Sequence, residues 1–142
     1  MTKRAPSAVY WDSSSILSVL FKDTHSIEAL NWFGKNGAHL ISTLGYTEVC
    51  AVISRIKREK LLADILIDVA FKALKTGPWR YLNIWPEWEK LRALSQKWSL
   101  RGTHLWHLAT AKALQNQIPE LTLLTFDSRL GIAAKGEGLL AK

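Results

Sequence analysis

Apolar residues in this chain occur either in short continuous runs or in longer stretches with helical spacing. The continuous runs are four to six residues long and rich in β-branched and aromatic side chains, a pattern typical of buried strands. They predict strands over 7–11, 38–42, 79–84 and 121–126. The last run, "LTLLTF", has no polar alternation, which indicates a strand covered on both faces of a parallel sheet.

Between these runs, apolar residues recur three and four positions apart, which predicts helices. The expected helices cover 13–22, 26–36, 42–60, 61–75, 87–98 and 103–116, and a last helix that begins at residue 128 gives way to a Gly-rich tail within 128–140. Ser13 or Ser14 caps the start of the first, and Gly37 is expected to cap the end of the second. Alternating strands and helices predict a three-layer α/β/α sandwich with a mainly parallel sheet, opened by a βαβ unit with two helices in its crossover.

Length and composition narrow the class of protein. A chain of 142 residues fits a single domain, 1–142. The net charge of +7 favours an anionic partner such as nucleic acid, although a generically basic surface explains it as well. The single cysteine excludes an internal disulfide. We find no apolar span long enough for a membrane helix and no signal-peptide pattern, and we therefore expect a cytoplasmic protein without membrane contact.

Three acidic residues stand where a ligand site is expected. Asp12 and Asp127 follow predicted strands, and ligands of open parallel sheets bind beyond the carboxyl ends of the strands. Glu48 lies on a helix beside apolar positions. Each acid also has a plain structural reading, as a helix cap, a turn residue or an exposed flank. Three carboxylates gathered at one edge would repel one another without a cation, so the pattern indicates magnesium or manganese.

Three segments of the sequence resemble the PIN domain family, the metal-dependent nuclease fold of VapC toxins in VapBC toxin–antitoxin pairs. They are "VYWDSSSIL", "STLGYTEVCAVISR" and "HLWHLATAKAL" followed by "LTLLTFDSRLGIAAKGEGL". Their order and spacing match over nearly the whole chain.

The resemblance implies a divalent-metal-dependent endoribonuclease that hydrolyses RNA phosphodiesters. It assigns Asp12, Glu48 and Asp127 as catalytic metal ligands, with Ser14 and Thr125 as supporting hydroxyls. It also implies Mg²⁺ as cofactor, with Mn²⁺ favoured if a histidine ligates. Homodimerisation and a cognate antitoxin protein are expected on the same ground.

The chain departs from the family at His104, where the family has its fourth acid. His104 either ligates a softer metal, stands aside while three acids hold magnesium, or marks a degenerate PIN domain that binds RNA or a protein partner without cleavage. For His107, three residues later, we favour packing against the sheet with one ring nitrogen bonded.

Basic residues supply a candidate RNA contact surface. These are Arg55, Lys57, Arg58 and Arg101. A solvated helix end, whose cations favour the negative end of the helix dipole, explains the first three equally well. Most of the seven tryptophans are better explained by a core or a protein interface than by base stacking.

Overall fold

The structure is a computed structural model that describes residues 7–140, with four strands and seven helices in that range. In chain order these are β1 (Ser7–Trp11), α1 (Ser13–Leu20), α2 (Ser26–Phe33), β2 (Gly37–Ser42), α3 (Thr43–Arg58), α4 (Asp64–Thr76), β3 (Trp79–Leu82), α5 (Trp88–Lys97), α6 (Gly102–Gln115), β4 (Thr122–Leu124) and α7 (Ser128–Gly136).

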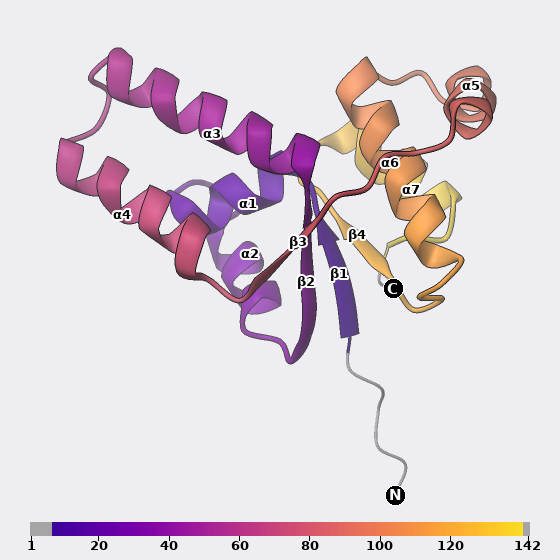
Figure 1. Ribbon diagram of the computed structural model, residues 1–142, viewed down its shortest axis with the longest axis horizontal. Helices are drawn as coiled ribbons and strands as arrows, with labels where there is room; N and C mark the ends of the chain where they lie inside the picture. Colours follow the sequence, from indigo (N-terminus) through magenta and orange to yellow (C-terminus); the bar gives the residue numbers. More distant parts are fainter. Residues whose placement is uncertain (1–6, 141–142) are drawn as a thin grey trace, which may run out of the picture.

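The four strands form one parallel sheet in the order β3-β2-β1-β4 (Figure 1). Strand β1 is central: Tyr10 pairs with Leu40 of β2 and with Leu123 of β4. The crossover from β1 to β2 contains α1 and α2, as the sequence predicts. Because all strands run the same way, their carboxyl ends meet at one edge of the sheet.

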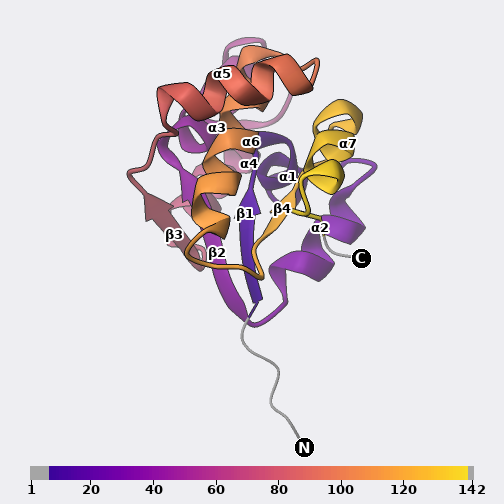
Figure 2. The same ribbon diagram turned by 90° about the vertical axis from the view of Figure 1, so that its right-hand side faces the viewer.

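Helices cover both faces of this sheet and make the expected three layers. Figures 1 and 2 show α1, α2, α3 and α4 on one side and α5, α6 and α7 on the other. Alternate residues of β1 point into different cores, since successive strand side chains face opposite sides of a sheet. Val9 and Trp11 belong to the core under α1–α4, whereas Ala8 and Tyr10 belong to the core under α5–α7.

Several element boundaries differ from the sequence prediction. Helix α2 ends at Phe33, because Gly34 already caps it, with its N–H donating to the Leu30 carbonyl. Gly37 does not cap this helix; it begins β2 with φ of 132°, a backbone conformation that favours glycine. Helix α4 begins at Asp64, three residues later than predicted.

Strands β3 and β4 each end two residues earlier than predicted. The early end of β4 leaves Thr125, Phe126 and Asp127 as a short connection to α7, and this connection reaches the end of β1. None of the helices within residues 7–140 has the length and apolar character needed to cross a lipid bilayer.

Candidate functional site

Asp12 lies at the carboxyl end of β1, caps the N-terminus of α1 and is almost fully buried, at 1% exposure. One carboxylate oxygen accepts hydrogen bonds from the Ser14 hydroxyl (2.7 Å) and the Ser15 backbone N–H (2.9 Å). The other accepts a short hydrogen bond from the Thr125 hydroxyl. Hydrogen bonds to a carboxylate are among the stronger ones in proteins, so the side chain is held in one orientation.

The same two hydroxyls attach the β4–α7 connection to this aspartate. Ser14 Oγ accepts the backbone N–H of Phe126 (3.1 Å), and Thr125 Oγ1 accepts that of Asp127 (3.1 Å). Ser14 and Thr125, predicted as supporting residues, therefore contact the Asp12 carboxylate and also place Asp127 beside it.

Asp127 caps the N-terminus of α7, where its Oδ2 accepts the Leu130 backbone N–H at 2.8 Å. His104 Nδ1 lies 3.6 Å from the same oxygen, and both side chains are partly exposed, at 26% for His104 and 32% for Asp127. This separation is longer than a hydrogen bond, so the contact is electrostatic and requires a protonated imidazole. The structure thus places His104 beside one of the three predicted acids, Asp127.

Glu48 reaches a different partner, His107. Its Oε1 lies 2.6 Å from His107 Nε2, with the glutamate side chain 24% and the histidine side chain 1% exposed. A carboxylate can only accept, so Nε2 of this histidine carries a proton. On the other side of the ring, Nδ1 lies 2.6 Å from the Tyr10 hydroxyl oxygen, which lies 2.8 Å from Ser42 Oγ.

The prediction for His107 is correct on burial and wrong on bonding, since both ring nitrogens have partners. Sequence reasoning missed the series of contacts from Ser42 through Tyr10 and His107 to Glu48, which we call the Ser42–Glu48 network. Its members come from β1, β2, α3 and α6. A polar residue in an otherwise buried strand, such as Tyr10, was the signal available, because a buried phenol requires a hydrogen-bond partner.

Tyr10 lies close enough to Asp12 and to Glu48 for their negative charges to affect its pKa. Burial raises the pKa of its phenol far above the ordinary range; the Ser42 hydrogen bond opposes this, and the negative charges of Asp12 and Glu48 raise the pKa further. The phenol is therefore neutral and serves as a hydrogen-bonding group between the two acids rather than as an ionising one.

The donor set has the chemistry of a hard-cation site, because carboxylate and hydroxyl oxygens suit magnesium and manganese. Within residues 7–140, however, no group of three or more acids, histidines or cysteines is arranged to hold a metal ion. Each carboxylate already has a protein partner. A cation held by Asp12, Glu48 and Asp127 together therefore requires these side chains to move closer together, and Glu48 and Asp127 are the more exposed.

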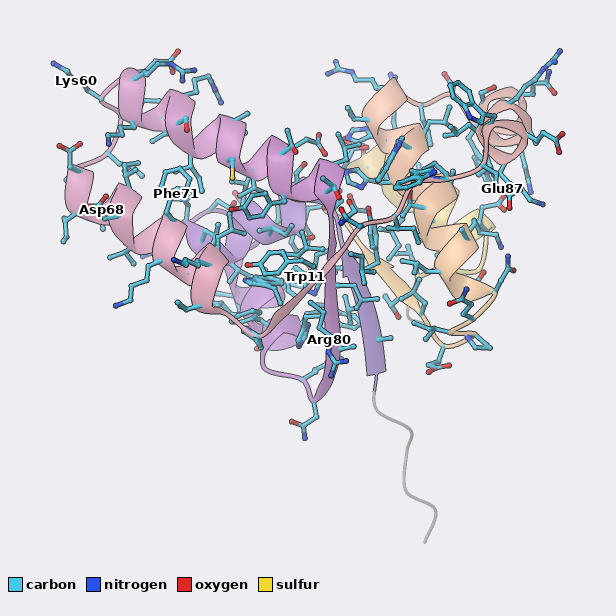
Figure 3. All side chains as sticks on the ribbon, in the orientation of Figure 1. Trp11, Lys60, Asp68, Phe71, Arg80 and Glu87 are labelled. Carbon is cyan, nitrogen blue, oxygen red and sulfur yellow. The ribbon has the colours of Figure 1, made fainter. Side chains whose placement is uncertain are left out.

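The candidate RNA-contacting cations lie in two places. Arg55, Lys57 and Arg58 are exposed on the last turn of α3, and Lys60 follows at the far end of this helix (Figure 3). Arg58 is ten residues after Glu48, or about 15 Å along the helix axis. Arg101 is exposed at the start of α6, three residues before His104. It is the one of the four predicted RNA contacts on the side of the molecule that carries Asp12, Glu48 and Asp127, which we call the acidic side.

Comparisons with known proteins identify the family and the fold. The sequence matches the PIN domain family over residues 9–136. No curated protein matches the chain.

Two solved structures share the fold. One is PAE2754 from Pyrobaculum aerophilum, with a TM-score of 0.62, 16% identity, and coverage of 92% of this chain and 81% of that one. The other is Mycobacterium tuberculosis VapC20, described as a sarcin-ricin loop cleaving toxin, with a TM-score of 0.58, 13% identity, and coverage of 89% and 95%.

Proposed function

The chain belongs to the PIN domain family, and on this premise we propose that it is a divalent-metal-dependent endoribonuclease, a VapC-like toxin component that hydrolyses RNA phosphodiesters. The observation that carries the proposal is the buried Asp12 carboxylate, held by Ser14 and Thr125 at the carboxyl edge of the sheet. A buried carboxylate without a cationic partner is costly unless hydrogen bonds or a metal compensate it. Asp127 and Glu48 add two further carboxylates from neighbouring elements.

In this proposal Asp12, Glu48 and Asp127 hold the cation, Mg²⁺ or, if His104 also ligates, Mn²⁺. A bound divalent cation activates a water and stabilises the negative charge that develops on the phosphate. The residues of this chain orient the carboxylates: Ser14 and Thr125 fix Asp12, and His107 fixes Glu48 through its Nε2 proton. No nucleophilic side chain is required.

Electrostatics supports RNA as the substrate class. The net charge of +7 attracts a polyanion, and Arg101 places a cation next to the acidic side. In the proposal Arg101 contacts phosphates near the cleaved bond, whereas Arg55, Lys57 and Arg58 contact a more distant part of the RNA. The description of VapC20, which shares the fold, points to the same class of substrate.

Apolar surface that is exposed to solvent supports the proposal that the chain binds protein partners. An apolar groove of about 300 Å³ lies between α1 and α3, lined mainly by Leu17, Phe21, Val52, Ile56, Leu61 and Leu62. Ile65 and Val69 of α4 continue this surface at 68% and 55% exposure. We propose an antitoxin segment here, in the cytoplasm, and a homodimer contact at Trp85 and Trp88, which are 77% and 89% exposed.

A second candidate is a degenerate PIN domain that binds RNA or a protein without cleavage. It is favoured by His104 at the position of a family acid and by the absence, within residues 7–140, of a group of three metal-ligating side chains. An imidazole brings no negative charge, so a hard cation is held less strongly than by four carboxylates.

The first experiment is a cleavage assay on single-stranded RNA with Mg²⁺ or Mn²⁺, using wild type and Asp12→Asn. Asn keeps the shape of Asp12 and an acceptor oxygen but removes the charge. Cleavage that falls at least about 100-fold, the loss typical of removing one electrostatic stabiliser, supports the nuclease. Equal cleavage by both proteins would show that Asp12 is not a ligand.

His104→Asp separates the nuclease from the degenerate domain. Calorimetric titration with Mg²⁺ and Mn²⁺ precedes cleavage on the same samples. If wild type binds Mn²⁺ and cuts, the nuclease assignment stands; if only His104→Asp binds metal and cuts, the natural chain is the degenerate form. Gln117→Asp, which adds one carboxylate at an exposed position beyond the far end of α6, is the control.

A further inference from the structure

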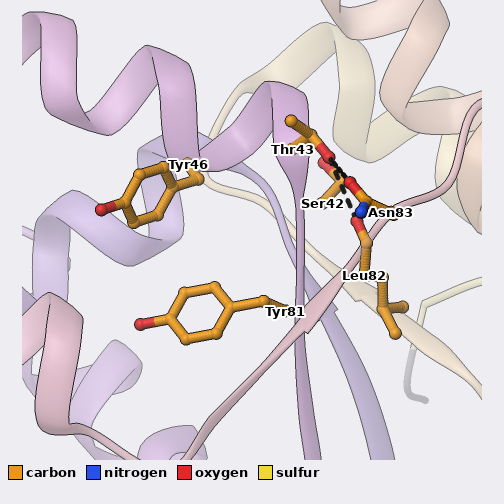
Figure 4. Close-up of a pocket in the computed structure, with 6 residues that line it drawn as sticks. All are labelled: Ser42, Thr43, Tyr46, Tyr81, Leu82 and Asn83. Carbon is orange, nitrogen blue, oxygen red and sulfur yellow. Dashed lines mark hydrogen bonds between the residues drawn. The ribbon is translucent and has the colours of Figure 1, made fainter.

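A pocket of about 210 Å³ opens at the carboxyl ends of β2 and β3 (Figure 4). Its lining comes from the end of β2, the first turn of α3 and the end of β3: Ser42, Thr43, Tyr46, Tyr81, Leu82 and Asn83. The function proposed above uses none of its exposed side chains.

Two partly exposed tyrosines form one wall of the pocket. Tyr46 of α3 and Tyr81 of β3 pack edge to face, with ring centroids 5.7 Å apart and an angle of 84°, at 40% and 50% exposure. The Tyr81 hydroxyl donates to the Leu74 carbonyl at the end of α4, which fixes its ring. The pKa of Tyr81 is raised by burial and that of Tyr46 by the charge of Cys50, so both phenols are neutral at physiological pH. The wall is therefore a preformed, uncharged aromatic surface.

The opposite wall is polar. Thr43 Oγ1 donates to the Asn83 side-chain oxygen (3.2 Å) and to the Leu82 carbonyl (3.3 Å). The Asn83 side chain lines the pocket and is exposed, so its amide N–H groups are accessible as donors. An aromatic surface opposite hydroxyl and amide groups is the combination by which proteins bind unstacked bases of single-stranded RNA.

The pocket is connected to the acidic side through Ser42. Ser42 lines the pocket and is the first member of the Ser42–Glu48 network, so three hydrogen-bonded contacts separate it from the Glu48 carboxylate. The N-terminus of α3 lies between the two and carries no acidic residue in its first turn. Its dipole favours an anionic group there, such as the phosphate that joins two nucleotides.

We propose that this pocket binds one base of a single-stranded RNA, with the base stacked on Tyr46 or Tyr81 and its edge hydrogen-bonded by Asn83 and Thr43. The inference rests on the proposed ribonuclease function and adds a specificity-determining subsite to it. A base held here places the adjoining phosphate over the start of α3, on the way to Glu48.

The test measures RNA affinity in the Asp12→Asn background and cleavage kinetics in the otherwise wild-type protein. Tyr81→Leu and Tyr46→Leu remove one ring each, whereas Tyr81→Phe and Tyr46→Phe keep the ring. Stacking of a base on an aromatic ring contributes about 1–3 kcal/mol, which corresponds to an affinity change of about 5- to 150-fold. We expect the Leu changes to raise Kd and KM by at least about fivefold with kcat unchanged, and the Phe changes to stay within about twofold.

Abasic substitutions in the RNA identify the base. Removing the bound base should weaken binding to the parent protein and have no further effect on the Leu variants, because ring and base form one contact. Ile27→Ala, a change at an exposed apolar residue of α2 outside the pocket, should leave Kd unchanged.

The possible results distinguish a failure of the pocket assignment from a failure of the proposed ribonuclease function. If the wild-type chain neither binds nor cuts RNA, both proposals are overturned. If it does and the Leu variants equal it, only the pocket assignment is overturned. The assignment also fails if sedimentation shows that the Leu changes dissociate an oligomer while the monomer keeps full RNA affinity, since the pocket would then be a protein interface.

Discussion

The two buried histidines, His39 and His107, lie on opposite faces of β1 and differ in what they contact. His39 is 3% exposed; its Nδ1 accepts the indole N–H of Trp11 (3.1 Å), and its Nε2 lies 3.0 Å from the Lys35 carbonyl. His107 is fully buried between Tyr10 and Glu48. In each case one partner is an aromatic side chain of β1.

The second partner decides what each histidine can do. The partners of His39 are both neutral: the indole of Trp11, in the core with Phe33 and Trp79, and the backbone carbonyl of Lys35, in the exposed turn before β2. This ring therefore joins the turn to the sheet. The second partner of His107 is a carboxylate that reaches solvent. Burial and complete hydrogen bonding are therefore compatible with a purely structural histidine and with one that orients a reactive group.

The largest difference in cleavage should come from replacing each histidine by leucine. We expect His107→Leu to lower RNA cleavage at least about tenfold, because leucine has no N–H to orient Glu48, whereas His39→Leu should leave kcat within about twofold. Both changes should lower the free energy of unfolding by about 1–3 kcal/mol, the cost of an unsatisfied buried polar group. Urea unfolding and the cleavage assay measure the two quantities. Equal losses of activity would remove the distinction between the two histidines.

A smaller difference in RNA cleavage is expected between variants of the two aromatic residues of β1, Tyr10 and Trp11. Tyr10→Phe removes only the hydroxyl between His107 and Ser42, so it should cost about 1–3 kcal/mol of stability and reduce cleavage severalfold. Trp11→Phe removes the donor to His39 and some packed volume, so it should cost at least as much stability with cleavage unchanged. If RNA cleavage fell in proportion to the loss of stability in both variants, the result would argue against a specific role of the Tyr10 hydroxyl.

The smallest effect concerns a partly buried acid that has cationic partners, Glu137. Lys97 Nζ and Trp98 Nε1 bond its carboxylate at 2.7 and 2.9 Å. Burial alone would raise the pKa of Glu137, but these hydrogen bonds and the charges of Lys97 and Lys112 lower it below the ordinary value. Since the folded-state pKa is depressed, this stabilisation is complete above the ordinary value, about 4.3, and is lost as the pH falls through the folded-state pKa.

Glu137→Gln should therefore lower the free energy of unfolding by about 1–2 kcal/mol at pH 7, with RNA cleavage unchanged. The difference from wild type should shrink between pH 7 and pH 3, because the glutamate loses its charge as the pH falls through its depressed pKa. Urea unfolding at the two pH values measures it. A difference of the same size at pH 3 would mean that packing, and not charge, accounts for the effect.

Much of the fold was predictable because local patterns carry it. The continuous apolar runs located all four strands, and helical spacing with caps located all seven helices of residues 7–140. Boundaries failed where a turn closed by backbone hydrogen bonds, as at Gly34, or where a strand lost its pairing partner, as at the end of β4. The position of Asp12 at a strand end followed from the sequence alone, because strand, acid and helix cap are consecutive.

The sequence by itself determined the layer order, the family and the three candidate acids, since each depends on residues close together in the chain. Only the tertiary structure decided which side chains these acids meet. Glu48 and His107 are 59 residues apart, and Tyr10 and His107 are 97 apart. Their contacts depend on the packing of α3 and α6 against opposite faces of the sheet, and no local pattern encodes that packing.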